Sequence, residues 1–595
     1  MMMLTKPSLS FLSKLAAAGC LSLGLATAAV AETTGAQSDQ SLAPPVSAHD
    51  GTSLSGLFLA ATLAETERDI PLAADFYRQA YDLDPASDRF IHSAFTMELA
   101  DGRMAGALDL ATILVAAGDS GMARLTLALD AMRQRSFRVA LRELDAYETD
   151  GFGELVAVLI SAWALHGNGD TDQALANLAE LEGPAWVELY STYHSALIRL
   201  ASGDAEGALG DMERAYSTDP GAMRLVQGYA RTLLANDRPE EAQEVLAGFL
   251  QLAPGNGVIQ SDFQAALDGQ PLEHRVTNAR QGAAEVLYGL GLAIGDDGAE
   301  EVGASYLNLA LFTDPDHNLA RFGLARVYES LELWERAVDV YELIGEAHPF
   351  KRSAEIRLGV LLDQLERPEE ADGHLLALIE ADPTDLEAIH TFGTVLRFRR
   401  DFEAAADVYT QAIDLIETPE DYHWRLFYQR GIAYERTERW PLAEADFLRA
   451  LELFPDQPDV MNYLAYTWVD RGENLDQSVE MLELAVELRP ESGYIVDSLG
   501  WVYFRLGRFE EAVEQLERAV SLDPTQGVIH DHLGDAYWMV GRRLEARFQW
   551  SHARDLDDDE VDREAIQRKL QRGLTREEVE SVGIWPEGYE IPMLQ

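Results

Sequence analysis

Histidine and aspartate side chains cluster in one short stretch near the C-terminal end, where "HDHLGD" brings together His530, Asp531, His532 and Asp535. Imidazole and carboxylate groups are ligands that zinc and related metals use in proteins. His530 and His532 are two positions apart, however, so on a helix they point to different faces. We therefore expect one of these histidines to pack and the other to meet solvent, without a metal site.

A second acidic run, "DLDDDE" at Asp555–Glu560, resembles a calcium-binding loop only superficially. The glycine that such a loop needs at its sixth position is Glu560, and its twelfth position is Ile566. We interpret this run as a solvated helix end. The sequence also lacks a glycine-rich loop followed by Lys-Ser or Lys-Thr, a His-Glu-x-x-His pair and a Gly-x-Ser-x-Gly turn. We expect no enzyme activity and no cofactor. An enzyme site hidden in the segments that break the repeat remains an alternative to the binding functions given below.

Small residues return at a fixed interval of about 34 residues, and this interval defines the elements that position any functional side chain. In the second half, the eighth position of each unit is Gly291, Ala325, Gly359, Gly393, Gly431, Ala465, Gly500 and Gly534. The twentieth position there is Gly303, Ala337, Ala371, Ala405, Ala443, Ser478, Ala512 and Ala546. In the first half, the twentieth position is Ala73, Ala107, Ala140, Ala174, Ala208 and Ala242.

Each unit has the pattern of two helices, because its apolar residues return three and four positions apart. Two antiparallel helices can approach closely only where their side chains are small, so Gly500 and Ala512 mark a crossing. Pro524 then stops the second helix, since proline lacks the amide and clashes with the preceding turn. A single pair cannot bury its apolar face, whereas a stack of pairs can. The sequence therefore predicts a stack of helical pairs.

This order of small, aromatic and proline positions resembles the tetratricopeptide repeat (TPR), over about fourteen units from Leu54 to Glu560. The resemblance implies an all-α fold, an α-solenoid wound as a right-handed superhelix. We expect a degenerate N-terminal array at 54–254, a joint or degenerate unit at 255–283 and a C-terminal array at 284–560. Residues 561–595 should form a cap and tail, with a capping helix over Val561–Arg572 that stops at Gly573.

In that family, positions 2, 5, 9, 12 and 13 of each first helix line an inner groove. The resemblance therefore places these residues in a partner-binding groove: Asn462, Tyr466, Tyr494, Asp497, Trp501, Phe504, Arg505, Asp531, Asp535 and Trp538. Aromatics interleaved with polar groups suit the binding of a peptide. The alternative is that some of them pack between neighbouring units. The family's carboxylate clamp is not matched, because its basic positions are mainly acidic or apolar in this sequence.

The charge balance and the N-terminus bear on partners and location. Acidic residues outnumber basic ones by 102 to 47, so we expect no nucleic-acid partner. Lys6 and Lys14 precede an apolar stretch over Leu15–Ala31, which ends in an Ala29-Val30-Ala31 cleavage pattern. We interpret residues 1–31 as a secretory signal peptide and 32–53 as a disordered linker. No transmembrane segment is expected.

Cys20 leaves a second location open. It is the only cysteine, and "AAGC" could serve as a lipoprotein processing box. The mature chain is then either periplasmic or an outer-membrane lipoprotein anchored through Cys20.

These observations predict a non-enzymatic scaffold or adaptor in the bacterial cell envelope, which binds partner polypeptides in the groove. The layout is similar to periplasmic or outer-membrane TPR adaptors of carboxyl-terminal processing proteases, which implies recruitment of substrates to a periplasmic protease. The alternative is a component of an envelope assembly or polysaccharide-export system. The sequence leaves the partner, the half that binds it and the oligomeric state open.

Overall fold

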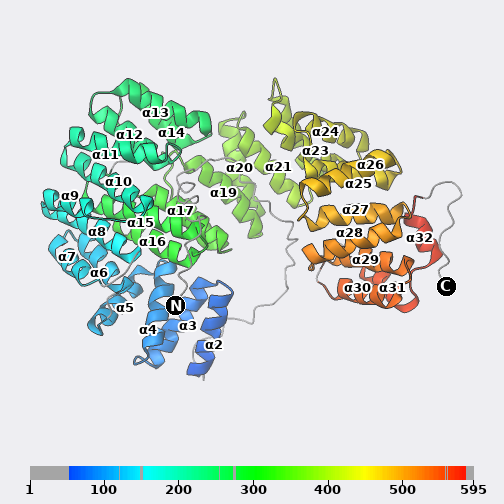
Figure 1. Cartoon of the computed structure of the whole chain (residues 1–595), viewed down its shortest axis with the longest axis horizontal. Helices are drawn as coiled ribbons and strands as arrows, with labels where there is room; N and C mark the ends of the chain where they lie inside the picture. The colour runs from blue at the N-terminus through cyan, green and yellow to red at the C-terminus, as the bar shows by residue number, and fades with distance from the viewer. Residues whose placement is uncertain are drawn as a thin grey trace, which may run out of the picture. The chain divides into compact units, whose positions relative to one another are not determined.

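The computed structural model describes residues 53–118, 121–147, 152–253, 255–272, 276–556, 558 and 561–584. Every regular element in these residues is a helix, and successive helices pack on one another as an α-solenoid (Figure 1). The described residues form two compact units, 53–374 and 375–584. The predicted signal peptide, Cys20, most of the predicted linker and the tail beyond 584 lie outside the described residues.

The helices of the first unit are α2 (Leu54–Thr66), α3 (Ile70–Leu83), α4 (Asp88–Ala100), α5 (Met104–Ala116), α6 (Met122–Arg133), α7 (Phe137–Asp145), α8 (Phe152–Asn168), α9 (Thr171–Ala179), α10 (Ala185–Ser202), α11 (Ala205–Thr218), α12 (Met223–Ala235), α13 (Pro239–Leu252), α14 (Gly257–Leu267), α15 (Ala279–Asp296), α16 (Glu300–Thr313), α17 (Asn318–Ser330), α18 (Trp334–Glu342) and α19 (Lys351–Gln364). Helix α20 (Pro368–Ala381) contains the division between the units.

The helices of the second unit are α21 (Leu386–Phe398), α22 (Phe402–Asp414), α23 (Trp424–Arg436), α24 (Trp440–Leu453), α25 (Pro458–Arg471), α26 (Leu475–Leu488), α27 (Gly493–Arg505), α28 (Phe509–Leu522), α29 (Gly527–Met539), α30 (Arg543–Asp555), α31 (Arg563–Arg572) and α32 (Arg576–Val582). A short 3-10 turn at Asp421–His423 precedes α23.

Glycine lies where the two helices of a pair cross. A Cβ atom on Gly500 would meet Cγ of Leu516 at 2.7 Å, and one on Gly534 would meet the Trp550 ring at 2.4 Å. Ala512, the small residue on the second helix, is fully buried. The predicted crossing at Gly500 and Ala512 is confirmed.

The turn inside a pair contains a residue in the left-handed region of backbone conformation. It is glycine in some pairs, such as Gly507 at φ 77°, but a charged residue in others, such as Arg68 at φ 60° and Glu332 at φ 59°. Non-glycine residues in this region cost about 1–3 kcal/mol. The packed helices on either side must therefore impose the turn on Arg68 and Glu332.

Residues 255–283, where the repeat frame breaks, lie inside the first unit. They contain α14 and the start of α15, and α14 packs against α12 and α13. Val258, Ile259 and Ala266 of α14 are buried. The division between the two compact units falls elsewhere, at residues 374 and 375.

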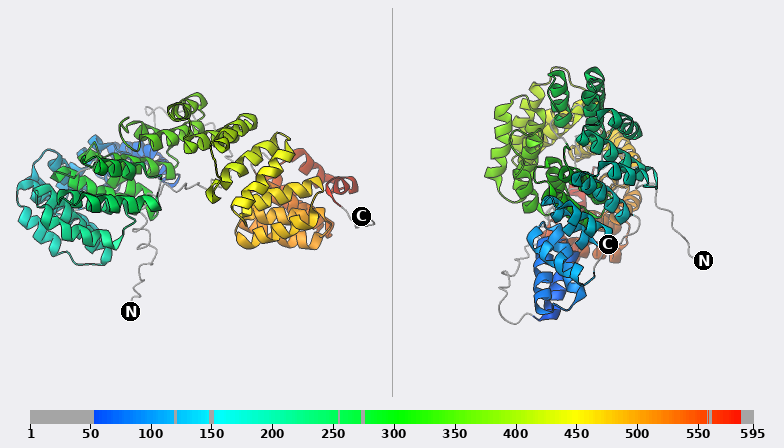
Figure 2. Two further views of the ribbon diagram at one scale, coloured as in Figure 1. Left: turned by 90° about the horizontal axis from the view of Figure 1, so that it is seen from above. Right: turned by 90° about the vertical axis from the view of Figure 1, so that its left-hand side faces the viewer.

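The first unit is filled from within by two of its own helices. Helix α15 packs against α6, α8 and α10, and α16 packs against α4 and α6, in addition to their neighbours in sequence. Figures 1 and 2 show these two green helices among the blue and cyan ones. Helices α4, α6, α8 and α10 are each the first helix of a pair. Helices α15 and α16 therefore lie on the inner face of the preceding repeats.

A buried polar cluster joins α15 to α10, to α12 and to the residue that precedes α17. Both carboxylate oxygens of Glu285 accept hydrogen bonds from Arg224, each at 2.7 Å. The Tyr193 hydroxyl donates to Glu285 at 2.9 Å, and the His317 ring lies 3.3 Å from it. Glu285 is 3% exposed. A buried carboxylate is tolerated because these groups replace its hydration.

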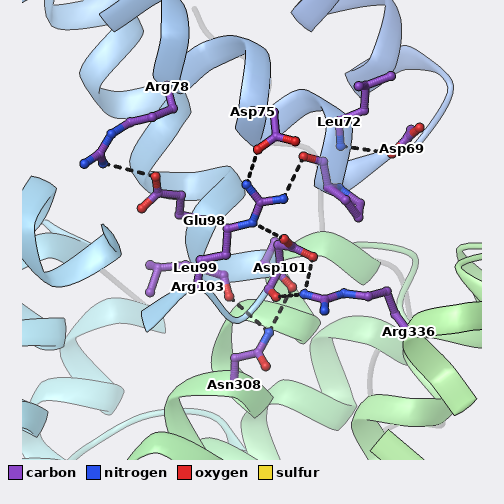
Figure 3. A network of polar contacts seen from close by, with 12 residues as sticks. Asp69, Leu72, Asp75, Arg78, Glu98, Leu99, Asp101, Arg103, Asn308 and Arg336 are labelled. Carbon is purple, nitrogen blue, oxygen red and sulfur yellow. Dashed lines mark hydrogen bonds and ion pairs between the residues drawn. The ribbon is translucent and has the colours of Figure 1, made fainter. Parts of the chain in front are cut away.

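A second polar network joins α4 to α16 and α18 (Figure 3). The Asn308 amide donates to the carbonyls of Leu99 and Ala100, at 3.0 and 2.9 Å. Arg336 donates to the side chain and the carbonyl of Asp101. These contacts satisfy carbonyls at the C-terminal end of α4, which have no partner within the helix itself.

Candidate functional site

The predicted groove residues lie on α25, α27 and α29, the first helices of consecutive pairs in the second unit. We call the side of these helices, and of α21 and α23, that carries positions 2, 5, 9, 12 and 13 the first-helix face. Tyr494 is 46% exposed, whereas Tyr466, Trp501 and Asp531 are half-buried. The remaining predicted residues are buried: Asn462, Asp497, Phe504, Arg505, Asp535 and Trp538.

An aromatic stack forms the middle of this face. The Trp501 ring lies parallel to Phe504 with centroids 4.8 Å apart, and stacks on His532 at 4.0 Å. Nδ1 of His532 lies 3.0 Å from the Asp497 carboxylate. Burial lowers the pKa of His532, but the Asp497 carboxylate outweighs it and raises this pKa above its ordinary value. Stacking and ion pairing together hold Trp501 in one orientation.

The two histidines of "HDHLGD" differ from the sequence expectation, because neither faces open solvent. His530 is buried, and its ring nitrogens contact Gln549 at 2.5 Å and the Pro524 carbonyl at 3.0 Å. His532 is packed under Trp501. The second helix of the same pair and the preceding repeat supply these partners, so a helix considered alone could not reveal them.

The carboxylates of Asp531 and Asp535 bind a lysine from α31. Lys569 Nζ lies 2.8 Å from Asp531 and 2.9 Å from Asp535, and the Trp550 indole donates to Asp535 at 2.9 Å. Burial raises the pKa of Asp535 to about 6, an effect that Lys569 offsets only in part. These two groove positions therefore hold the capping helix in place.

The acidic run at Asp555–Glu560 also has a structural role. Asp558 is buried, and its carboxylate accepts from the amides of Gly527 and Val528, at 2.7 and 3.2 Å. These amides begin α29, so the side chain satisfies donors that have no partner in the helix. The expectation of a solvated helix end is wrong for Asp558; residues 557, 559 and 560 lie outside the described part.

Residues 573–584, which we call the C-terminal segment, cover one edge of the first-helix face. Gly573, at φ 79°, seats against the Trp538 ring, where a Cβ atom would come within 1.9 Å. Nε of Arg505 donates to the Val582 carbonyl at 2.7 Å, and the Ile584 amide donates to the Arg505 carbonyl at 2.7 Å. Phe504 and Trp538, at position 12 of their repeats, and Arg505, at position 13, thus lie beside this segment.

A basic corner on α21 and α23 was missed, because the groove was assigned from the last three repeats only. His390, Arg397 and Arg425 occupy positions 5, 12 and 2 of their repeats, counted from Gly393 and Gly431. Among the described residues, neither arginine has a carboxylate partner. Burial first, and then these two guanidinium groups, lower the pKa of His390 to about 4. Applying the same register to the earlier repeats would have found all three.

Two cavities lie in the first unit, where α17 and α18 meet the beginning of the array. The smaller one, about 310 Å³, is lined by leucines and by Arg321 and Arg336. Arg336 is paired with Asp101, and Arg321 donates to Asn318. Because both guanidinium groups are already engaged, this cavity offers little free positive charge to a ligand.

Neither a metal site nor a membrane span is found in the described part of the chain. Within it, no group of three or more His, Cys, Asp or Glu side chains is arranged to hold a metal ion. No helix among the described residues is both long and apolar enough to cross a membrane.

Comparison with known families finds the repeat in both units. Residues 199–267, 390–492 and 500–541 match models described as tetratricopeptide repeat or TPR repeat. Over 194 residues the chain is 27% identical to a TPR repeat-containing protein of Pseudomonas aeruginosa, which covers 32% of each chain. The chain thus contains TPR units, whose architecture is that of a protein–protein interaction scaffold.

Solved structures of helical-repeat proteins are similar at low scores. The APC/C Cut9–Hcn1 assembly contains a chain that is 14% identical, with 88% of this chain and 97% of that chain covered and a TM-score of 0.37. Yeast Tom70 is 14% identical, with 71% and 95% covered and a TM-score of 0.39. MamA of AMB-1 is 25% identical, with 28% and 97% covered and a TM-score of 0.25. These similarities carry no information on what this chain binds.

Proposed function

We propose that this chain is an exported adaptor of the bacterial cell envelope, which holds partner polypeptides on the first-helix face of its second unit and brings them to a periplasmic protease. TPR units support the role of a protein-binding scaffold. The basic start, apolar stretch and cleavage pattern within residues 1–31 support export. The first unit is not the binding half in this proposal, since α15 and α16 fill its inner face.

The observation that carries the proposal is the aromatic surface around Trp501. This ring stacks on both Phe504 and His532. Tyr494 is 46% exposed, and its hydroxyl donates to Asp459 of the preceding repeat. Rigid, partly exposed aromatics bind a polypeptide at low cost in side-chain entropy. They also tolerate varied sequences, which an adaptor requires.

The basic corner adds a preference for acidic groups in the partner. Arg397 and Arg425 each bring a positive charge to the face of a chain whose net charge is −55. A guanidinium group binds a carboxylate with directed, charge-assisted hydrogen bonds. A bound carboxylate would also raise the pKa of His390 from its low value, because it would offset the two neighbouring cations.

A crosslinked pull-down from the cell envelope tests this function. The native chain is compared with a Tyr466→Ala, Trp501→Ala double variant, and captured proteins are identified by mass spectrometry. Leu544→Ala with Phe548→Ala is the matched control, because these side chains are 70% and 61% exposed on α30, the second helix of its pair. We expect one dominant partner that the control retains and the double variant loses at least tenfold, with unchanged helical content.

The identity of the captured protein decides between specific versions of the function. A carboxyl-terminal processing protease or its substrate supports the proposal. Capture of export or assembly machinery instead would contradict the protease version and favour the alternative role. A partner that binds the double variant as strongly as the native chain would overturn the assignment of the first-helix face.

A further inference from the structure

The C-terminal segment shows what kind of polypeptide the edge of the first-helix face accepts. It makes two hydrogen bonds to Arg505, one through the side chain to the Val582 carbonyl and one through the backbone from the Ile584 amide. Both bonds engage backbone groups of the segment, so they do not depend on its side chains. A second guanidinium nitrogen of Arg505 donates to Asp470 at 2.8 Å, which fixes the orientation of the arginine.

The side chains of the segment supply the selective contacts. Val579 is fully buried, Leu574 is 6% exposed, and Val582 and Ile584 are partly buried against the same core as Trp501 and Phe504. Three of these four residues are β-branched, so they lose little rotamer freedom when they dock. The surface around Arg505 therefore favours segments whose branched apolar residues lie beside a free backbone amide and carbonyl of the same segment.

The segment is attached by few interactions of its own. Helix α32 is short, with a capping box between Thr575 and Glu578, and a helix of this length is marginal in water without packing. Its outward residues Arg576, Glu577 and Glu580 are exposed. Two buried side chains, two partly buried ones and two hydrogen bonds must offset the ordering of the whole segment, which places it at the low-stability end of the unit.

We propose that the surface formed by Asp470, Phe504, Arg505 and Trp538, here named the edge site, is a reversible site for polypeptide segments that present branched apolar residues beside a free backbone amide and carbonyl. The C-terminal segment is its resident occupant, and a partner segment of the same chemistry displaces it. This inference rests on the proposed function in that it assigns a ligand class and a competitor to the same face.

Binding of a labelled peptide tests the edge site. The probe is a fluorescent peptide of residues 573–584, "GLTREEVESVGI", and the readout is fluorescence anisotropy with the full chain. In one variant chain, Val579→Asp and Ile584→Asp loosen the resident segment. We expect this variant to bind the peptide at least tenfold more tightly than the native chain does. Adding Arg505→Ala should reverse that gain, and a peptide with the same two aspartates should bind neither chain.

Equal binding of the peptide by the native and the loosened chain, at native helicity, would overturn the proposal. If the loosened chain loses helicity, hydrogen exchange of the native chain decides. Amides of residues 579–584 should exchange at least tenfold faster than those of α29, and equal protection would mean a fixed cap. The pull-down relies on Tyr466 and Trp501, whose substitution leaves the segment's bonds to Arg505 intact. Failure of the edge site and failure of the proposed function are therefore distinguishable.

Discussion

Tyr190 in the first unit and Tyr494 in the second occupy the same position of the repeat, each 18 residues before the alanine at the twentieth position, Ala208 or Ala512. Their surroundings differ. Tyr190 packs against α15, where a Cβ atom on Gly289 would come within 3.3 Å of its ring, and stacks on His194. Tyr494 is 46% exposed. The same local sequence rule thus produces a half-buried residue packed on the core in one unit and an exposed residue in the other.

A helical repeat thus determines which residues share a face, but it does not determine whether that face is buried or exposed. In the first unit, the chain continues into α15 and α16, which pack on the inner face. Helix α15 carries Glu285, whose carboxylate accepts hydrogen bonds from Arg224. In the described part of the second unit, Lys569 of α31 reaches Asp531 and Asp535, and the C-terminal segment covers one edge of the face. The helices that come after an array in the chain therefore decide whether its inner face can bind a partner.

Removal of the Glu285 carboxylate should break the first unit while sparing the second. Glu285→Ala leaves the half-buried Arg224 guanidinium without its carboxylate and with Gln227 still bonded, which costs about 3 kcal/mol. We expect hydrogen exchange in α10, α12 and α15 to become faster by orders of magnitude, whereas α27 is unchanged. Glu188→Ala, on the exposed side of α10, is the control and should change stability by less than about 0.5 kcal/mol. Equal loss of protection in both units would contradict independent cores.

Two glycine substitutions of the same kind should have opposite signs. Gly534→Ala places a methyl group 2.4 Å from the Trp550 ring, so overpacking should destabilise the second unit by about 1–3 kcal/mol. A Cβ atom on Gly210 in α11 meets nothing within 4 Å, so Gly210→Ala should stabilise the first unit by about 0.5–1 kcal/mol. Urea unfolding, monitored by hydrogen exchange of the amides in each unit, measures both changes in stability. Destabilisation by Gly210→Ala would show that the exposed side of α11 is incorrectly described.

The C-terminal end of the second unit should be more stable at mildly acidic pH than at pH 8. The pKa of Asp535 is raised to about 6, so the folded state binds its proton more tightly than the unfolded chain does, and this contribution is lost as pH rises through 6. The pKa of His532 is also raised, so its contribution is present below its unfolded value of about 6.5 and is lost above the folded value. The combined effect should be on the order of 1–2 kcal/mol.

Hydrogen exchange of residues 561–584 at pH 5.5 and pH 7.5, corrected for intrinsic rates, measures this dependence. Asp497, Asp531 and Lys569 face the two groups, and we expect the change to come from Asp535 and His532. A chain with Asp535→Asn and His532→Gln should lose most of it. If the double variant keeps the full pH dependence, the acidic residues of the rest of the surface are responsible instead.

The sequence was sufficient for features set by neighbours along the chain. Gly500 and Ala512 predicted the helix crossing because close packing within a pair leaves a local signal in residue size. The sequence could not predict that α15 returns to α8 and α10, because Glu285 meets Tyr193 from 92 positions away. The left-handed turns at Arg68 and Glu332 were missed for a related reason, since packing rather than residue type imposes them.

The candidate site was predictable in its register and less so in its exposure. Counting from the small residues identified the positions of Trp501 and Tyr494 on the first-helix face. It could not reveal that Lys569 binds Asp531 and Asp535, or that the C-terminal segment covers Arg505, because both come from the cap and not from the repeat. Whether these residues bind a partner stays a prediction.

A photo-crosslinking residue at position 494, compared with one at position 190, tests whether the first-helix face binds a partner in the second unit and not in the first. Each full chain carries a benzophenone side chain in place of the tyrosine and is irradiated in cells. We predict that position 494 forms covalent adducts with another polypeptide, whereas position 190 crosslinks only within its own chain, to α15. Adducts with a partner from position 190, and none from position 494, would contradict the account.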